Sequence, residues 1–387
     1  MPTARARVSS AVMTHPVRRA QAQELSDRLG LGGLALDPDP GGPPSALRTA
    51  LVAWARTAEG ATHHLMIQDD VAAPGDFVDL VAHCADRFPD DALAYYTNWH
   101  ARNGAAARLA ALAGAGWVRA VPEEFTPTLA IVLPVALADG FRGYATGSAE
   151  RHDDELMAAF LRGHGRPALL AVPTVTEHTG TSSINGHAAQ GVRLAVCPSE
   201  SADARPLLLG GWVLEELDWL PYMRYGEGFI RLPGQDTTPA ARHHFTWREA
   251  LPRTGLSEAA VLGTLGSRGP AEEKQARQVA EVFGPSFADE LWIHCLLLGV
   301  QARAAARRYA PGGGGTAGAA AIGGGTAATA AAGRLRAAAV STVGPAGLPP
   351  ERRPEAGREH TALLAEYSFA AVRCGERLPE RALADRR

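Results

Sequence analysis

The chain has 387 residues, which is enough for a full hydrophobic core and for about two structural units. Hydrophobic residues at 46% and charged residues at 20% are typical of a globular protein, and 38 Lys plus Arg against 41 Asp plus Glu give a formal charge of −3, which argues against a nucleic-acid partner. The 4 cysteines are far apart, which argues against a disulfide framework or a zinc site and fits a reducing cytoplasm.

The first predicted element is a strand over residues 7–13, and the interrupted apolar run behind the basic start leads us to expect no signal peptide. Residues 17–29 have helical spacing, and Gly30 is the expected helix stop. A second short strand, over residues 34–36, ends at Asp37 in a loop rich in proline and glycine. The chain therefore begins as strand, helix and strand.

Ser45 is the expected cap of a helix over residues 46–58, and the central strand follows at residues 65–67. Asp69 and Asp70 come directly after this buried strand, at the end of the sheet where α/β proteins bind ligands. Paired carboxylates there suit Mg²⁺ or Mn²⁺ held against phosphates. A solvated strand end without function is the alternative.

Alternating strands and helices continue beyond the central strand. The longest apolar stretch, residues 129–137, is too short to cross a bilayer, so we expect no transmembrane segment and a cytoplasmic location. Because the connections are short, we predict an α/β fold, a mostly parallel sheet with helices on both faces. Four elements belong to this part: a helix over residues 75–88, strands over 92–99 and 128–134, and a short helical piece over 135–139.

An acidic cluster begins the next predicted helix, where Asp153 and Asp154 lead into an apolar helical pattern. Carboxylates at a helix start are also favoured by the helix dipole, so a purely structural role is an alternative. A last strand over residues 168–172 is followed by Glu177 and His178. Taken singly, His178 is as consistent with a structural role as with a functional one.

After residue 200 the composition changes to tryptophan, tyrosine, glycine and proline. Trp212 and Trp219 have flat aromatic faces on which a sugar ring can stack, with a place in the core of a small second domain as the alternative. Residues 271–309 have long helical spacing with an interruption at Gly284. The expected division is an α/β domain at 1–200, an accessory and candidate substrate-side region at 201–309, a Gly/Ala-rich flexible linker at 310–350 and a helical tail at 351–387.

The order of these features resembles the GT-A type glycosyltransferases, specifically the bacterial enzymes that use nucleotide-sugars, over roughly residues 7–190. The GT-A fold is a Rossmann-like α/β fold, which agrees with the predicted elements. Five segments carry the resemblance: Thr14-His15-Pro16 with Arg18 and Arg19 behind it, Asp37 after the second strand, the turn Gln68-Asp69-Asp70, the acidic start Asp153-Asp154-Glu155, and Glu177-His178.

The resemblance implies a role for each of these positions. Asp37 would contact the nucleobase of the donor, and Asp153 or Asp154 would serve as base. Gln68 departs from the family pattern, which places an aspartate there. Donor-binding residues would be His15, Arg19, Asp37 and Asp69, and Asp70 and His178 would hold Mn²⁺ or Mg²⁺ on the diphosphate.

The function implied is an inverting glycosyltransferase that moves a sugar from a nucleotide-diphosphate sugar to an acceptor hydroxyl. A catalytically silent relative that binds a glycan or a partner protein is one alternative. A sugar-phosphate nucleotidyltransferase is another alternative. That class begins with a Gly-rich phosphate loop, however, and residues 14–17 do not form one. The donor sugar and base, the acceptor and the oligomeric state stay open.

Overall fold

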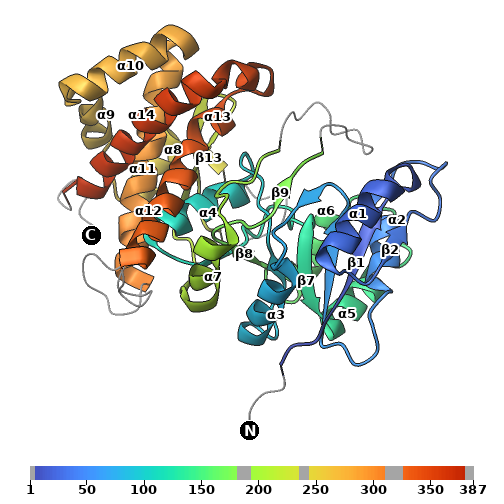
Figure 1. Cartoon of the computed structure of the whole chain (residues 1–387). Helices are drawn as coiled ribbons and strands as arrows, with labels where there is room; N and C mark the ends of the chain where they lie inside the picture. Colours follow the sequence, from blue (N-terminus) through green and yellow to red (C-terminus); the bar gives the residue numbers. More distant parts are fainter. Residues whose placement is uncertain (1–4, 181–192, 235–243, 310–325, 380–387) are drawn as a thin grey trace. The chain divides into compact units, whose positions relative to one another are not determined.

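The computed structural model describes residues 5–180, 193–234, 244–309 and 326–379 (Figure 1). The chain divides into two compact units. The first consists of Met1–Asn98 and Gly116–Gly211, and the second of Trp99–Ala115 and Trp212–Arg387. We expected the first domain to span residues 1–200. The first unit instead ends at Gly211, and Trp99–Ala115 belongs to the second unit.

The described residues of the first unit contain a sheet in which seven strands follow one another in the order β6-β8-β5-β7-β3-β1-β2. Strand β1 is parallel to β2 and β3, and β5 is parallel to β8, whereas β7 is antiparallel to β3 and β5 and β6 is antiparallel to β8. The strands are β1 Val8–Thr14, β2 Leu34–Leu36, β3 His63–Gln68, β5 Leu93–Ala94, β6 Trp117–Arg119, β7 Ala130–Pro134 and β8 Leu169–Ala171.

This sheet is mixed, and the expectation of a mostly parallel sheet was wrong. Hydrophobic periodicity marks a segment as a strand but carries no information on its direction, which depends on where the connecting chain re-enters the sheet. The α/β class was predicted correctly. Strand β3 is an interior strand, but it lies third from the β2 edge rather than at the centre of the sheet.

The helices of the first unit begin and end largely at the expected signals. Gly30 ends α1 in the left-handed conformation, with φ of 65°. Ser45 caps α2, because its side chain accepts a hydrogen bond from the Arg48 amide. The helices are η1 Pro16–Arg18, a 3-10 turn, and α1 Arg19–Leu29, α2 Ala46–Trp54, α3 Phe77–Arg87, α5 Val135–Ala145, α6 Asp153–Gly163 and α7 Ser201–Gly210.

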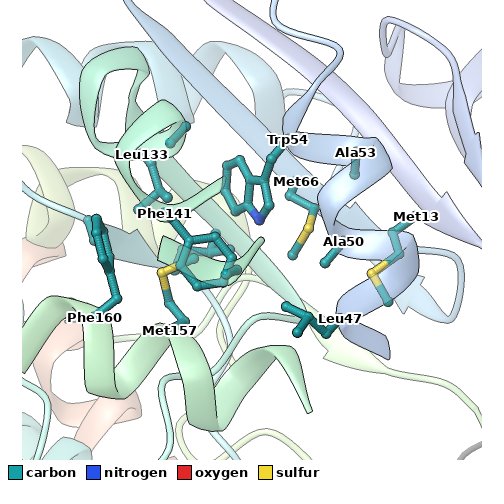
Figure 2. Close-up of a cluster of buried hydrophobic side chains, with 14 of the residues drawn as sticks. Met13, Leu47, Ala50, Ala53, Trp54, Met66, Leu133, Phe141, Met157 and Phe160 are labelled. Atoms are coloured by element: carbon teal, nitrogen blue, oxygen red, sulfur yellow. The ribbon is translucent and has the colours of Figure 1, made fainter. Parts of the chain in front are cut away.

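One face of the sheet is buried under α2, α5 and α6 (Figure 2). Trp54, Phe141 and Met157 come from these three helices and pack with Met66 of β3. Side chains alternate along a strand, so Ile67 faces the other side, where it is also fully buried. Strand β3 is therefore covered on both faces, which fixes the position of the turn that follows it.

The second unit combines helices with a small antiparallel sheet, β11-β12-β13. Helix α11 packs against α14, α10 and α4, and Gly284 separates α10 from α11 as predicted. Its elements are α4 Arg102–Ala113, β10 Val213–Leu214, β11 Leu220–Arg224, β12 Glu227–Arg231, β13 His244–Thr246, α8 Trp247–Thr254, α9 Glu258–Gly266, α10 Pro270–Phe283, α11 Pro285–Tyr309, α12 Thr326–Ser341, α13 Val343–Gly347, the 3-10 turn η3 Pro350–Ala356 and α14 Arg358–Arg377.

Part of the expected linker is helical. Residues 326–347 form α12 and α13, with Leu335 and Val340 buried, while residues 310–325 lie outside the described residues. Alanine has the highest helix propensity of all residues, which explains why an alanine-rich run with few apolar anchors folds as a helix. The expected helical tail is α14. None of the helices in the described part of the chain is long and apolar enough to cross a membrane.

The aromatic residues after position 200 belong mainly to the core of the second unit. Trp219 packs in a cluster with Trp247 and Ile293. Trp212 is also buried, with 7% of its surface exposed. The burial of both side chains gives no support to stacking on an acceptor sugar. Trp219 instead has the alternative role, as a core residue of the second unit.

Candidate functional site

Asp69 and Asp70 follow the end of β3 directly, and both are buried. Strands β1 and β3 pair in parallel with Met13 opposite Gln68, so Thr14 lies beside Asp69. The Thr14 hydroxyl donates a hydrogen bond to Asp69 Oδ2. The register of two neighbouring strands thus fixes the position of the first carboxylate.

The guanidinium of Arg18 bridges the two carboxylates. Its Nη1 lies 3.1 Å from Asp69 Oδ1 and 3.1 Å from Asp70 Oδ2. Arg19, which we expected to bind the donor, is exposed and lines neither of the cavities described below. Successive residues at a helix start point in different directions, so only one of the two arginines can enter the site.

His178 reaches Asp70 through a two-stranded sheet. Strand β4, Val71–Ala72, pairs antiparallel with β9, Glu177–His178, and places Val71 opposite His178. His178 Nε2 consequently lies 3.4 Å from Asp70 Oδ2. The sequence places these two side chains far apart along the chain, and the structure brings them together as predicted.

The residues after His178 also hold the Asp70 segment. The amide and the hydroxyl of Thr179 both donate hydrogen bonds to the Asp70 carbonyl, at 2.9 Å and 3.1 Å. At Gly180 an added Cβ would lie 2.5 Å from Asp70 Oδ2. Only glycine allows the backbone to pass this close to the carboxylate.

Burial and neighbouring charges act on the two aspartates in different ways. Burial raises the pKa of Asp69. Burial also acts to raise the pKa of Asp70, but the hydrogen bond with His178 and the positive charges of Arg18 and Arg193 lower it overall. Asp70 is therefore the more readily ionised of the pair.

Arg193 Nη2 lies 3.0 Å from His178 Nε2. A guanidinium can only donate, so this contact needs an Nε2 without a proton, whereas a protonated Nε2 donates to Asp70, the hydrogen bond that lowers the pKa of that carboxyl. A metal ion on Nε2 would take the lone pair in place of Arg193.

Asp70 and His178 carry the oxygen and nitrogen atoms that could serve as two ligands of a divalent cation. Asp70 Oδ1 is buried and has no hydrogen-bond partner among the described residues, and Oδ2 faces the imidazole. In the part of the chain that the structure describes, no group of three or more His, Cys, Asp or Glu is arranged to hold a metal. Mg²⁺ and Mn²⁺ sites commonly use few protein ligands and leave the rest to phosphate oxygens and water.

A first cavity, of about 140 Å³, adjoins the aspartate pair. At one side of it the Asp37 carboxylate accepts hydrogen bonds from Arg48 Nε at 2.7 Å and Nη2 at 2.8 Å, and this contact with Arg48 lowers the pKa of Asp37. Its lining residues are Met13, Thr14, His15, Arg18, Asp37, Pro40, Gly42, Pro44, Ser45, Ala46, Arg48, Thr49, Gln68, Asp69, Asp70 and Arg193.

A second cavity, of about 300 Å³, contains the acidic start of α6. Asp153 is buried and accepts a hydrogen bond from the Thr128 side chain, but burial still raises its pKa. Burial and the charge of Asp153 raise the pKa of Asp154 to about 6. Its lining residues are Ala46, Gln68, Tyr96, Asn98, Phe125, Pro127, Thr128, Leu129, His152, Asp153, Asp154, Glu155, His178 and Arg193.

The two cavities adjoin, because Ala46, Gln68 and Arg193 line both. Of the eight residues that we expected in the site, all but Arg19 line one cavity or the other: His15, Asp37, Asp69 and Asp70 the first, and Asp153, Asp154 and His178 the second. No family model matches the chain, and a search of curated proteins finds no match either.

Sequence reasoning did not assign roles to Arg48 and Arg193. Arg48 lies in the first turn of α2 and reaches Asp37 across the preceding loop. Arg193 comes well after the last predicted strand in the sequence, which ends at residue 172. No local spacing links either arginine to its partner, so no signal in a single sequence could have found them.

Proposed function

We propose that this chain is a glycosyltransferase with a GT-A type arrangement, which moves a sugar from a nucleotide-diphosphate sugar to an acceptor hydroxyl with inversion. One observation carries the proposal: the Asp70 and His178 pair and the Asp153 and Asp154 pair belong to adjoining cavities. Displacement of a diphosphate needs cationic groups at the leaving group and a base on the other side of the reacting carbon.

The first cavity is the proposed donor subsite. Asp37 and Arg48 are the paired acceptor and donor groups proposed to meet a nucleobase: 24% of the Arg48 side chain is exposed, and its guanidinium also donates to the Pro43 and Asp39 carbonyls. His15 lines the same cavity, and its Nδ1 accepts a hydrogen bond from the Val17 amide. Arg18 and Arg193 are the cationic side chains placed to meet the phosphates.

The diphosphate end of the donor would lie at the aspartate turn. A divalent cation held by Asp70 and His178 would neutralise charge on the departing diphosphate. Arg18 would then leave the carboxylates and turn to phosphate oxygens, because a guanidinium binds phosphate as well as carboxylate. Asp69 keeps its position through the hydrogen bond from Thr14.

Asp154 is the proposed general base. With its pKa raised to about 6 it is ionised at neutral pH and is a stronger base than an ordinary carboxylate. The bond between the anomeric carbon and the diphosphate oxygen breaks, and the electron pair leaves with the diphosphate. The acceptor oxygen forms its bond to that carbon from the opposite face, and its proton passes to Asp154. Asp153, deeper in the structure, contributes the negative charge that helps to raise the pKa of Asp154.

A silent binding protein of the same architecture is the second candidate. The observation that favours it is the double ion pair of Arg18, whose single positive charge already lies between Asp69 and Asp70. In a binding protein this pairing would persist, and no cation would be required.

The geometry does not favour a nucleotidyltransferase, because the β1 to α1 connection is a short 3-10 turn rather than a Gly-rich loop.

Calorimetric titration with UDP and with GDP, each with and without Mn²⁺, tests the proposal. We expect binding of one nucleotide that requires Mn²⁺ and that Asp70→Asn abolishes, while the exposed Asp139→Asn leaves it unchanged. A panel of nucleotide-sugars then identifies the donor, since a ligand at 100 times its Kd adds about 2.7 kcal/mol to the free energy of unfolding. Absence of any nucleotide binding would instead favour the silent binding protein.

A further inference from the structure

The second cavity has an acidic wall, which we define as Asp153, Asp154 and Glu155 in the first turn of α6. Two further carboxylates lie close enough to act on it: partial burial and the charges of Asp154, Glu124 and Glu150 raise the pKa of Glu155. Three of these five acidic groups line the cavity, and the charges of the other two act on Glu155 from outside it.

The positive groups that face this wall are few. Those that line the cavity are His152, His178 and Arg193, and the last belongs to the end shared with the first cavity. None of the acidic-wall carboxylates forms an ion pair with a described lysine or arginine. Asp153 is buried, Asp154 is half-buried and Glu155 is exposed, so the loss of hydration that makes an unpartnered carboxylate unfavourable falls mainly on Asp153.

A second observation points to a missing hydrogen-bond donor. Asp153 is only 3% exposed, and its Oδ2 is buried without a hydrogen-bond partner among the described residues. The carboxylate also accepts hydrogen bonds from the Thr128 side chain, which lines the cavity, and from the backbone of Asp153 and Asp154, so the unsatisfied acceptor is Oδ2 alone. A buried acceptor of this kind costs about 1–3 kcal/mol unless something donates to it.

We propose that the second cavity binds a protonated amine of the sugar substrate, held by the acidic wall. This inference rests on the proposed function, because it specifies what the glycosyltransferase acts on. An ammonium group carries three N–H donors and one positive charge, which matches the surplus of acceptors and negative charge here. Phe125 and Pro127 line the same cavity and supply an apolar surface for the carbon face of a sugar ring.

The amine can belong to the acceptor or to the donor sugar, and the chemistry of recognition is the same. An amine on the acceptor would place its hydroxyl next to Asp154. An amine on the donor sugar would be tethered to the diphosphate in the first cavity. The two sources can be told apart with the nucleotide in its own subsite. A free amino sugar still binds there if the amine belongs to the acceptor, but not if it belongs to the donor.

Ligand-detected NMR with glucosamine, glucose and N-acetylglucosamine tests the inference on the full chain, first alone and then with UDP and Mn²⁺. We expect glucosamine to bind at least about tenfold more tightly than its two neutral analogues, a preference of about 1.4 kcal/mol. Binding that persists with UDP and Mn²⁺ identifies the acceptor. A preference found only for UDP-glucosamine over UDP-glucose identifies the donor. Equal affinity for charged and neutral sugars in both formats overturns the inference.

Two variants separate charge from shape. Glu155→Gln keeps the size of the side chain, and we expect it to reduce the preference for glucosamine several-fold; Glu155→Lys places a competing ammonium in the cavity and should abolish it. Glu59→Gln, at an exposed position that lines neither cavity, is the matched control. A preference that survives both Glu155 variants also overturns the inference. If UDP binds but glucosamine shows no preference, only this inference fails; if glucosamine is preferred but no nucleotide binds, the proposed function fails.

Discussion

Asp70 Oδ2 and His178 Nε2 lie 3.4 Å apart, although the two residues come from distant parts of the chain. The β4 to β9 pairing creates this proximity, since it sets Val71 opposite His178. A carboxylate oxygen and an imidazole nitrogen at this separation can share one cation, or one proton, but not both. Which of the two they share distinguishes a metal-dependent enzyme from a binding protein.

The first prediction concerns His178. Replacing it by His178→Gln removes one of the two proposed ligands, so we expect the affinity for Mn²⁺ in the presence of UDP to fall by about tenfold or more. His164→Gln, at an exposed histidine after the end of α6, is the control and should bind as the wild type does. Titration calorimetry measures both. Unchanged Mn²⁺ affinity in His178→Gln would rule out the site.

Arg18 and the metal ion should compete for the carboxylates of Asp69 and Asp70. In Arg18→Gln the buried carboxylates of Asp69 and Asp70 lose their counter-charge, and we expect the free energy of unfolding to fall by about 3 kcal/mol without metal. Mn²⁺ should restore more stability to this variant than to the wild type, in which it must first displace the guanidinium. Urea denaturation with and without Mn²⁺ measures both effects.

The neighbouring arginine provides the control for that experiment. Arg19 is exposed, so Arg19→Gln should leave the unfolding free energy within about 0.5 kcal/mol of the wild type. If Arg18→Gln and Arg19→Gln were equally stable in the absence of metal, the bridge between Asp69 and Asp70 would have no energetic role, and the exchange with metal would have no basis.

Asp154 should show opposite effects on activity and on stability. Its pKa is raised from 3.8 to about 6 by burial and by Asp153, so the folded state holds this proton more tightly than the unfolded state does. The resulting stabilisation is complete below pH 3.8 and is lost as the pH rises to about 6. Asp154→Asn mimics the protonated form and should be about 2–3 kcal/mol more stable than the wild type at pH 7.5, with no difference near pH 3.5.

The same substitution should remove glycosyl transfer, because the amide cannot accept the proton of the acceptor. In the wild type kcat/KM should fall as the pH drops below about 6. Denaturant unfolding at the two pH values, with Asp139→Asn as an exposed control, measures the stability effect. An Asp154→Asn protein that is less stable than the wild type at pH 7.5 would contradict this assignment.

The sequence predicted the strands and helices around the first cavity, and there is a physical reason for this. Strand β2 was predicted with its exact bounds, and Ser45 and Gly30 mark helix ends through local hydrogen bonding and backbone conformation. Such signals act within a few residues and can be recognised in one sequence. Helix α4 was missed, because it is buried on all sides and so has no amphipathic period.

The partners of the site residues could not be predicted in the same way. The positions of Asp37 and Asp70 follow from strand ends, but Arg48 and Arg193 reach the site from other segments. Their contacts depend on the three-dimensional path of the chain rather than on spacing. The mixed direction of the sheet has the same origin, because β7 carries a strand pattern that is equally compatible with either direction.

The last prediction uses the close approach of Gly180 to Asp70. An added Cβ would lie 2.5 Å from Asp70 Oδ2 and 3.1 Å from its Cβ, so Gly180→Ala must displace the carboxylate or the backbone of the Thr179 segment. The carboxylate is held by Arg18 and faces His178, and a shift of it separates the proposed ligands. We expect loss of Mn²⁺-dependent nucleotide binding, with the unfolding free energy reduced by about 1–3 kcal/mol.

Gly75 offers a matched control for the substitution at Gly180. A Cβ at Gly75 would meet no atom within 4 Å, so Gly75→Ala should leave Mn²⁺-dependent nucleotide binding unchanged. Calorimetry on the two alanine variants compares a glycine at the site with a glycine elsewhere in the first unit. If Gly180→Ala bound UDP and Mn²⁺ as tightly as Gly75→Ala, the Asp70 carboxylate could move freely, and its position would not be what defines the metal site.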